Sequence, residues 1–517
     1  RDSSTSRGLG DVYKRQIFDR LNEFFEELNQ QDVAPNQEVI ELYIKEIYAE
    51  VTSLNADNNP YLSRHSVLER LYNLADLTCD FAEIFEEKFF NHLNALNFRN
   101  IELKIAKQYK MNGGNDFWRN IWEIYADIAL HYSALNIDSK ALSNAKTALK
   151  LMIRTEAKPD PKWISFLNSR IAYAYQDIAP DKSINYFNKS SDALIEYNKV
   201  KDCYENNMGI ILNDINIAII MLEINQVDDA IKQSLKCLDT LNNLFEKYGE
   251  NEELVNYISH TYSILSRAYF ESKDYDNAEK AIEKGLSFCK RLQENKFNNY
   301  CEIIDVLYST KSLILCEKQR YMKAIELQYK LLDVWSDYKE GFKRSTKICD
   351  IYVEISMIFS KYLDEQGMSI ESARLAFREI KQYTDNELFM SDKYALSVRR
   401  RCYINLADAY FRARMYQSAI SSYTNALDIM KEEFDMESEK ISLVYSYSYT
   451  LYQLAMLDFK YNRKAEGCKR LSYSYRSVCT LKKYGGVYEV LFNMVRNALS
   501  TYEKKFDGKI IELDTAQ

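Results

Sequence analysis

Small residues recur along this chain of 517 residues at a nearly constant interval, and this spacing restricts the possible folds more than any other feature of the sequence. They occupy eight positions separated by 42 to 49 residues: Ala141, Ser183, Ala230, Ala278, Ala324, Ala373, Ala419 and Gly467. Self-similarity at such a period is typical of repeat proteins, in which each unit buries its apolar face against its neighbours. The spacing therefore predicts an array of about eight units rather than one globular core.

The clearest unit contains two stripes of residues with helical periodicity. The first follows the i, i+3, i+4, i+7 pattern of one helix face and consists of Tyr403, Leu406, Ala407 and Tyr410. The second lies on a following helix and consists of Ala419, Tyr423 and Ala426. Alanine at 407 and 419 would let the two backbones approach closely, with the large rings filling the space on either side. This pattern predicts an antiparallel helix hairpin.

With Ala419 counted as position 20, the residues at positions 4, 7, 8, 11, 20, 24 and 27 of this unit resemble the tetratricopeptide repeat (TPR) family. The same frame is strong around Ala141 and Ala278 and weaker in the other five copies. The resemblance implies an all-α fold, an α-α superhelix of stacked antiparallel hairpins. The period near 47 exceeds the standard period of about 34 residues, so we expect helices of about 20 residues, each about 30 Å long.

The period also falls in the range of HEAT and armadillo repeats, which are the main structural alternative. Those repeats usually carry a proline kink in the first helix and a characteristic Asp/Arg pair. Neither recurs here, and the chain has no proline after Pro180. A long segment without proline also favours helices joined by short loops over strands joined by tight turns.

The sequence divides into four parts. Residues 1–16 resemble translated sequencing adapter, a contaminant of assembled reading frames, and are expected to be non-native; a disordered polar tail is the alternative. Residues 17–120 are expected to be helical but out of register, with a linker at Asn55–Pro60 and a boundary at Met111–Asn115. The repeat array is expected over 121–500, and a closing turn and loose tail over 501–517.

Charge and cysteine usage exclude several classes of protein. The formal net charge of −8 does not match a general nucleic-acid binder, and no apolar run approaches the ~20 residues of a membrane span. The ten cysteines are scattered singly, and several, such as Cys237 and Cys316, fall where a repeat needs a small apolar residue. We therefore expect buried free thiols and a cytoplasmic location.

The sequence offers no recognisable catalytic or metal-binding pattern. It contains no phosphate-binding glycine loop, no HExxH or GxSxG, and no Cys/His metal spacing, so we expect no enzyme activity, no cofactor and no metal. The four histidines are isolated in sequence; His131 or His260 pairing with a cysteine is a far weaker interpretation than an ordinary helix histidine. Glu252–Glu253, Glu432–Glu433 and the basic run Arg399–Arg401 are read as solvated, with a phosphate site at the basic run as the alternative.

A stacked array of this kind offers a concave groove, which in the TPR family is lined by positions 2, 5, 9, 12 and 13 of each first helix. Carrying these positions over to the units centred on Ala278 and Ala419 gives candidate groove residues that combine aromatic rings with charges, the composition that anchors peptides: His260, Arg267, Phe270, Glu271, Arg401, Asp408, Phe411 and Arg412. Each could instead be an ordinary solvated or core-facing helix residue. The Lys/Asn clamp that some family members use on C-terminal carboxylates is not reproduced.

The function expected from these features is a non-catalytic scaffold whose groove binds a protein or peptide, with no direct contact to nucleic acid or membrane. The alternative is the sensor or regulatory C-terminal half of a larger enzyme or transcription regulator. Ile17 opens the first apolar stripe without a Ser, Thr, Asp or Asn cap, which predicts that a preceding segment is missing. The sequence does not specify the ligand, the pathway or the oligomeric state.

Overall fold

The computed structural model describes residues 3–31, 34–54, 63–89, 91–135, 137–200, 202–294, 300–338, 341–384, 393–436 and 440–505. The chain divides into two compact units. We refer to residues 1–176 and 185–203 as the N-terminal unit, and to residues 177–184 and 204–517 as the C-terminal unit. The division falls inside one helix, α8 (Pro180–Asn198).

The N-terminal unit begins with longer and less regular helices and continues into hairpins. Its helices before α8 are α1 (Ser3–Gln30), α2 (Gln37–Ser53), α3 (Arg64–Glu83), the π-helical turn η1 (Ile84–Lys88), α4 (His92–Met111), α5 (Ile121–Ala134), α6 (Asp138–Thr155) and α7 (Pro161–Tyr175). Leucine, isoleucine and phenylalanine side chains from α1 to α4 form one buried cluster.

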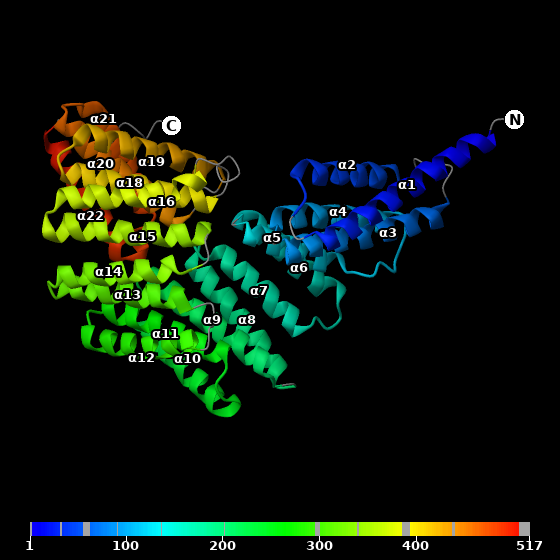
Figure 1. The fold of residues 1–517 in the computed structure, drawn as a ribbon, viewed down its shortest axis with the longest axis horizontal. Helices are drawn as coiled ribbons and strands as arrows, with labels where there is room; N and C mark the ends of the chain where they lie inside the picture. The colour runs from blue at the N-terminus through cyan, green and yellow to red at the C-terminus, as the bar shows by residue number, and fades with distance from the viewer. Residues whose placement is uncertain are drawn as a thin grey trace. The chain divides into compact units, whose positions relative to one another are not determined.

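The C-terminal unit is a stack of antiparallel hairpins that follow one another in chain order (Figure 1). The first helix of each hairpin is α9 (Tyr204–Glu223), α11 (Glu252–Glu271), α13 (Tyr300–Glu317), α15 (Phe342–Ile358), α18 (Lys393–Arg412) or α20 (Ile441–Lys460). The second helices are α10 (Val227–Tyr248), α12 (Tyr275–Glu294), α14 (Tyr321–Ser336), α16 (Gln366–Thr384), α19 (Tyr416–Met436) and α21 (Lys464–Cys479). The π-helical turn η2 (Phe359–Leu363) follows α15, and the 3₁₀ turn η3 (Lys482–Tyr484) and α22 (Gly486–Lys505) close the stack.

The predicted all-α superhelix of hairpins is confirmed. Within the described ranges the regular structure is helical and no strand occurs. The array helices have 14 to 22 residues, close to the expected length. In the same part of the chain, no helix combines the length and the apolar character that crossing a membrane requires.

A repeated turn fixes the spacing between the two helices of each hairpin in the C-terminal unit. Six non-glycine residues have a positive φ of 56° to 64° and end the first helices of the C-terminal unit: Asn225, Lys273, Gln319, Asp364, Arg414 and Asn462. A left-handed residue at this place lets following amide groups bond back to the last carbonyls of the helix. After α11, for example, Asp274 N donates to Tyr269 O at 2.9 Å. Each hairpin therefore closes with the same αL turn.

The predicted small residues of the second helices are buried, as the close approach of two helices requires. Ala141, Ala230, Ala278, Ala324 and Ala419 are at most 2% exposed, and each is the fourth residue of its helix. At Gly467 an added Cβ would lie 2.8 Å from the ring of Phe459. In these hairpins of the C-terminal unit the small residue follows the αL residue by five positions.

The frame assigned to Ala373 is wrong by one helical turn. The residue five positions after Asp364 is Ser369, which is the fourth residue of α16 and fully buried. Its hydroxyl lies 3.1 Å from that of Ser356 on α15, in the place that Ala407 and Ala419 occupy in the hairpin of α18 and α19. The π-helical turn η2 adds one further residue to this hairpin, since a π turn holds more residues than an α turn. Ala373 lies one turn further along α16 and is also buried.

Enlarging one of these contacts should destabilise the C-terminal unit. Ala419 and Ala407 are both fully buried in one cluster with Tyr423. We expect Ala419→Leu to lower the free energy of unfolding by about 1–3 kcal/mol, because a larger side chain forces the helices apart. Ser421→Leu, at an exposed position of the same helix, should change it by less than about 0.5 kcal/mol. Equal effects in urea denaturation would contradict the assignment.

One expectation for the N-terminal region differs from the structure, and the others stay predictions. The first helix begins at Ser3 and continues through Gln16, so residue 17 is not a helix start; an existing helix extends more easily than a new one nucleates. The likeness of residues 1–16 to adapter stays a prediction. The segment Met111–Asn115 lies between packed helices, because α4 and α5 share a buried cluster, and the division into compact units falls elsewhere. That the regular array begins after this segment stays a prediction. The linker at Asn55–Pro60 lies outside the described residues.

The basic run and one acidic pair are not fully solvated, contrary to the sequence-based interpretation. Arg400 is 4% exposed and its Nε lies 2.7 Å from Oε2 of Glu433 on α19, which is 8% exposed. Arg401 pairs with Asp350, and the Arg399 guanidinium lies over the Tyr403 ring. Residues i and i+1 of a helix point in different directions, so adjacent arginines take different partners.

Candidate functional site

The first helices of the C-terminal unit form the inner layer of its stack. First helices of successive hairpins contact each other directly, α9 with α11, α11 with α13 and α15 with α18. The two ends of the stack also meet, because Ile441 N at the start of α20 donates to Asp177 O at 2.9 Å, and Ile224 packs with Leu481. A stack whose ends meet is curved, and the layer in mutual contact lies on the inside of the curve. We call the surface formed by α11, α13, α15, α18 and α20 the inner face.

Charged side chains connect neighbouring first helices across the inner face. Lys347 Nζ on α15 donates to Asp305 Oδ2 on α13 at 2.9 Å. Further along, Arg401 Nη1 on α18 lies 2.8 Å from Asp350 Oδ1 on α15. These four side chains keep 14% to 44% of their surface exposed, so a ligand could reach them.

Glu354 is a carboxylate of this surface whose pKa is raised far above its ordinary value. Burial, followed by repulsion from Asp305, raises the pKa of Glu354 to about 7, although Gln328 Nε2 donates a hydrogen bond to its Oε2. Burial also raises the pKa of Asp305 and of Asp350, against the attraction of Lys347 and Arg401. We call Asp305, Asp350 and Glu354 the carboxylate cluster. Its three acids face two directly bonded cations and repel one another.

Groups two hairpins apart interact across this surface. Arg267 on α11 lowers the pKa of Glu354 on α15, although α13 lies between these helices in chain order. An interaction between side chains two hairpins apart is expected on the inside of a curved stack, where side chains of several helices converge. The inner face therefore presents a connected set of charges rather than isolated surface pairs.

Asp408 forms a second polar centre on the inner face. Burial raises the pKa of Asp408 to about 6. Its carboxylate accepts hydrogen bonds from the Tyr423 hydroxyl and from the Tyr449 hydroxyl, the latter at 3.0 Å to both oxygens. Two tyrosine donors from α19 and α20 thus fix Asp408, whose chief role in the structure is to join three helices.

The structure places the other predicted groove residues in several environments. On α11, Arg267 Nε and Glu271 Oε1 form an exposed pair at 2.8 Å. His260 is half-buried; burial lowers its pKa, against the opposing effect of Glu302 on α13. Phe270 packs against a hydrophobic cluster, its ring 5.9 Å from that of Tyr275.

On α18, the predicted residues also differ in exposure. Phe411 is half-buried and its ring centre lies 5.9 Å from that of Tyr416, within the cluster of Ala407 and Ala419. Arg412 is exposed and lowers the pKa of Asp408. Of the eight predicted residues, Arg267 and Arg401 interact with the carboxylate cluster.

The carboxylate cluster was not among the sequence-based candidates. Its residues lie in the units centred on Ala324 and Ala373, which match the TPR pattern only weakly. In the second of these units the pattern is also displaced by one helical turn. Counting back from Ser369 and allowing one residue for η2 places Asp350 at position 2, the position of His260 and Arg401. This count would have identified Asp350 as a groove candidate, but it can be made only when the π turn is known.

A cavity of about 580 Å³ lies where the two ends of the stack meet. Its lining residues are mainly apolar, among them Ile178, Phe434 and Leu481, and include the polar residues Tyr447 and Lys483. The cavity could hold an apolar side chain. Residues able to hold a metal ion lie elsewhere, in the N-terminal unit: Glu86, His92 and His131.

Comparisons with known proteins show a fold-level likeness only. No protein-family model matches the chain. No curated protein matches it either. Among solved structures, the chain is similar to the apo form of the quorum sensor NprR from B. thuringiensis, with 14% identity and a TM-score of 0.44 over 81% of this chain and 99% of that one. It is also similar to a Rap protein complexed with competence and sporulation factor, with 14% identity and a TM-score of 0.40 over 78% and 100%.

A third similar structure is a signal-transduction ATPase with numerous domains and a tetratricopeptide repeat sensor from Pyrococcus horikoshii, with 14% identity and a TM-score of 0.39 over 85% of this chain and 65% of that one. At these identities and TM-scores, none of the similarities transfers an activity or a ligand to this chain.

Proposed function

We propose that the inner face of the C-terminal unit binds an extended protein or peptide segment and places one of its basic side chains against the carboxylate cluster. The observation that carries the proposal is the meeting of Asp305 on α13 with Asp350 and Glu354 on α15, where, among the described residues, Lys347 and Arg401 are the two cations bonded to the three acids. A lysine or arginine of a ligand would relieve the repulsion among these acids. Partly desolvated charge pairs at the centre of an interface contribute strongly to affinity and specificity.

The remaining inner-face residues fit a polypeptide better than a small molecule. Arg267, Glu271 and Arg412 are exposed on either side of the carboxylate cluster along the stack, so charged groups extend over several hairpins. Long surfaces of this kind suit an extended ligand that is held at several points. The same carboxylates would repel the phosphates of nucleic acids and of acidic membranes.

We propose a non-catalytic role and a reducing, cytoplasmic location for this scaffold. Seven of the ten cysteines are buried as thiols, including Cys237 and Cys316 as predicted. Burial raises the pKa of Cys237 and of Cys289 to about 12, which keeps both thiols protonated and unreactive at neutral pH.

Peptide arrays test the proposal. Three sets of short peptides, matched in length and hydrophobicity, would carry lysine or arginine, only neutral residues, or aspartate and glutamate. We expect the full chain to prefer the basic set, and the double variant Asp350→Asn, Glu354→Gln to bind its best members at least ~10-fold more weakly, equivalent to about 1.4 kcal/mol.

The matched control is Glu283→Gln, at an exposed position of the second helix α12, which should bind like the unaltered chain. Preference for the acidic set, or unchanged binding by the double variant, would refute the proposal.

A further inference from the structure

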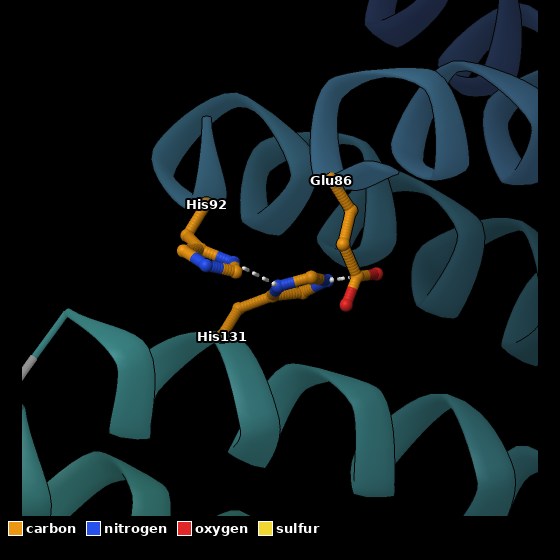
Figure 2. A group of neighbouring side chains, drawn as sticks. All are labelled: Glu86, His92 and His131. Atoms are coloured by element: carbon orange, nitrogen blue, oxygen red, sulfur yellow. Dashed lines mark hydrogen bonds and ion pairs between the residues drawn. The ribbon is translucent and has the colours of Figure 1, made fainter. Parts of the chain in front are cut away.

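A second group of polar residues lies in the N-terminal unit, far from the inner face in sequence. It contains His92, Glu86 and His131, whose possible ligand atoms all lie within 4.8 Å of one another. His92 is the first residue of α4, Glu86 lies in η1 just before it, and His131 lies in the last turn of α5. Figure 2 shows the two imidazole rings facing each other and Glu86 extending toward the far side of the His131 ring.

We propose that these residues bind a divalent transition-metal ion such as zinc, with Nδ1 of His92 and Nδ1 of His131 as ligands. The two nitrogens are 3.3 Å apart. Tetrahedral zinc with Zn–N bonds of 2.0–2.1 Å separates two nitrogen ligands by about 3.3–3.4 Å. The observed spacing of the two nitrogens therefore matches that of two ligands on one zinc ion.

Glu86 completes this arrangement from the other side of the His131 ring. Its Oε2 lies 3.6 Å from His131 Nε2, which is buried and has no hydrogen-bond partner among the described residues (Figure 2). If Nδ1 binds the metal, Nε2 carries the proton and points it at this carboxylate. Histidine ligands of metals generally donate their second ring N–H to such an acceptor, which fixes the ring and strengthens the ligand.

The burial of these residues fits a metal site that is open on one side. His131 is fully buried. His92 is half-buried and the Glu86 side chain is 28% exposed, which leaves a path for the ion and for water ligands. π-helical turns such as η1 frequently occur at functional sites.

The nearest positive charges are neutralised locally. Arg99 lies 2.9 Å from Glu102, 3.4 Å from Asp127 and 3.7 Å from Glu83. Arg119 pairs with Glu102 and Asp127 and lies 3.7 Å from Glu123. With Glu86, five carboxylates surround two guanidinium groups, so the region has a surplus of negative charge that a divalent cation would reduce.

Calorimetric titration of the full, EDTA-treated chain with zinc chloride tests the site. We expect one zinc ion per chain in the unaltered protein and at least a 10-fold loss of affinity in His92→Ala. Glu86→Gln should weaken binding by about 10- to 100-fold, as removal of an outer partner of a histidine ligand does. His65→Ala is the matched control, because His65 is an exposed histidine of the same unit, and it should bind like the unaltered chain.

Cobalt(II) absorption separates this site from binding to cysteine. Nitrogen and oxygen ligands give visible bands without the intense thiolate-to-cobalt band, and His92→Ala should abolish them. Thermal melting checks that each variant is folded. A thiolate band in the unaltered protein, or zinc binding equal in the unaltered chain and His92→Ala, would overturn the proposal.

Discussion

Replacing Arg400 by methionine should lower the free energy of unfolding by about 3–5 kcal/mol, the usual cost of removing one partner of a buried ion pair. Arg400 and Glu433 are both less than 9% exposed and meet at 2.7 Å between α18 and α19. Without the guanidinium, the Glu433 carboxylate would be buried without its counter-charge. Urea denaturation of the full chain, followed by circular dichroism, measures the change.

The double variant Arg400→Met, Glu433→Met provides the control. Burial lowers the pKa of Arg400 and raises that of Glu433, so in each case desolvation outweighs the attraction of the partner. Replacing both charges by apolar groups should therefore restore most of the lost stability. A double variant as unstable as Arg400→Met would show that packing, rather than the uncompensated charge, causes the loss.

Replacing Glu354 by glutamine should stabilise the protein at alkaline pH. Its folded-state pKa of about 7 lies above the ordinary glutamate pKa of 4.5, so the folded state holds this proton more tightly than the unfolded state. The stability contributed by Glu354 is therefore full below pH ~4.5 and is lost as pH rises through 7. At pH 8 we expect Glu354→Gln to be more stable than the unaltered chain by about 1–3 kcal/mol, a range that allows for partial solvation of the group.

The pH dependence distinguishes this effect from a general change in packing. At pH 5 the difference between Glu354→Gln and the unaltered chain should be small, because the carboxyl is then largely protonated in the folded state. Glu283→Gln, which is exposed on α12, should show no such change with pH. A destabilised Glu354→Gln at pH 8 would mean that Glu354 serves the fold. The expected result would instead indicate a charge retained at a cost to stability.

The sequence predicted the hairpins because their contacts depend on residue size. Ala407 and Ala419 leave room for two backbones, and that requirement recurs in each unit whatever the surface residues are. It did not predict the displacement at Ser369, because the π turn η2 changes the count without changing the apolar pattern. The sequence did not predict the αL residues either, since Lys273, Gln319 and Arg414 are residue types that rarely adopt this conformation.

The two proposed sites depend on contacts that no local pattern shows. His92 and His131 are 39 residues apart and appear isolated in sequence, yet the α4–α5 packing brings their rings together. Asp350 and Arg401 likewise meet only because α15 and α18 are neighbouring first helices. Arg401 was predicted from its position, whereas Asp350 was missed because its repeat is out of frame.

Hydrogen–deuterium exchange of the full chain, with and without the best-binding basic peptide, tests the inner-face proposal most directly. We expect added protection in the first helices α13, α15 and α18, around Asp305, Glu354 and Arg401, and the loss of that protection in the Asp350→Asn, Glu354→Gln variant. Protection confined to second helices such as α12 and α14, or to the N-terminal unit, would contradict the proposal that the inner face is the binding surface.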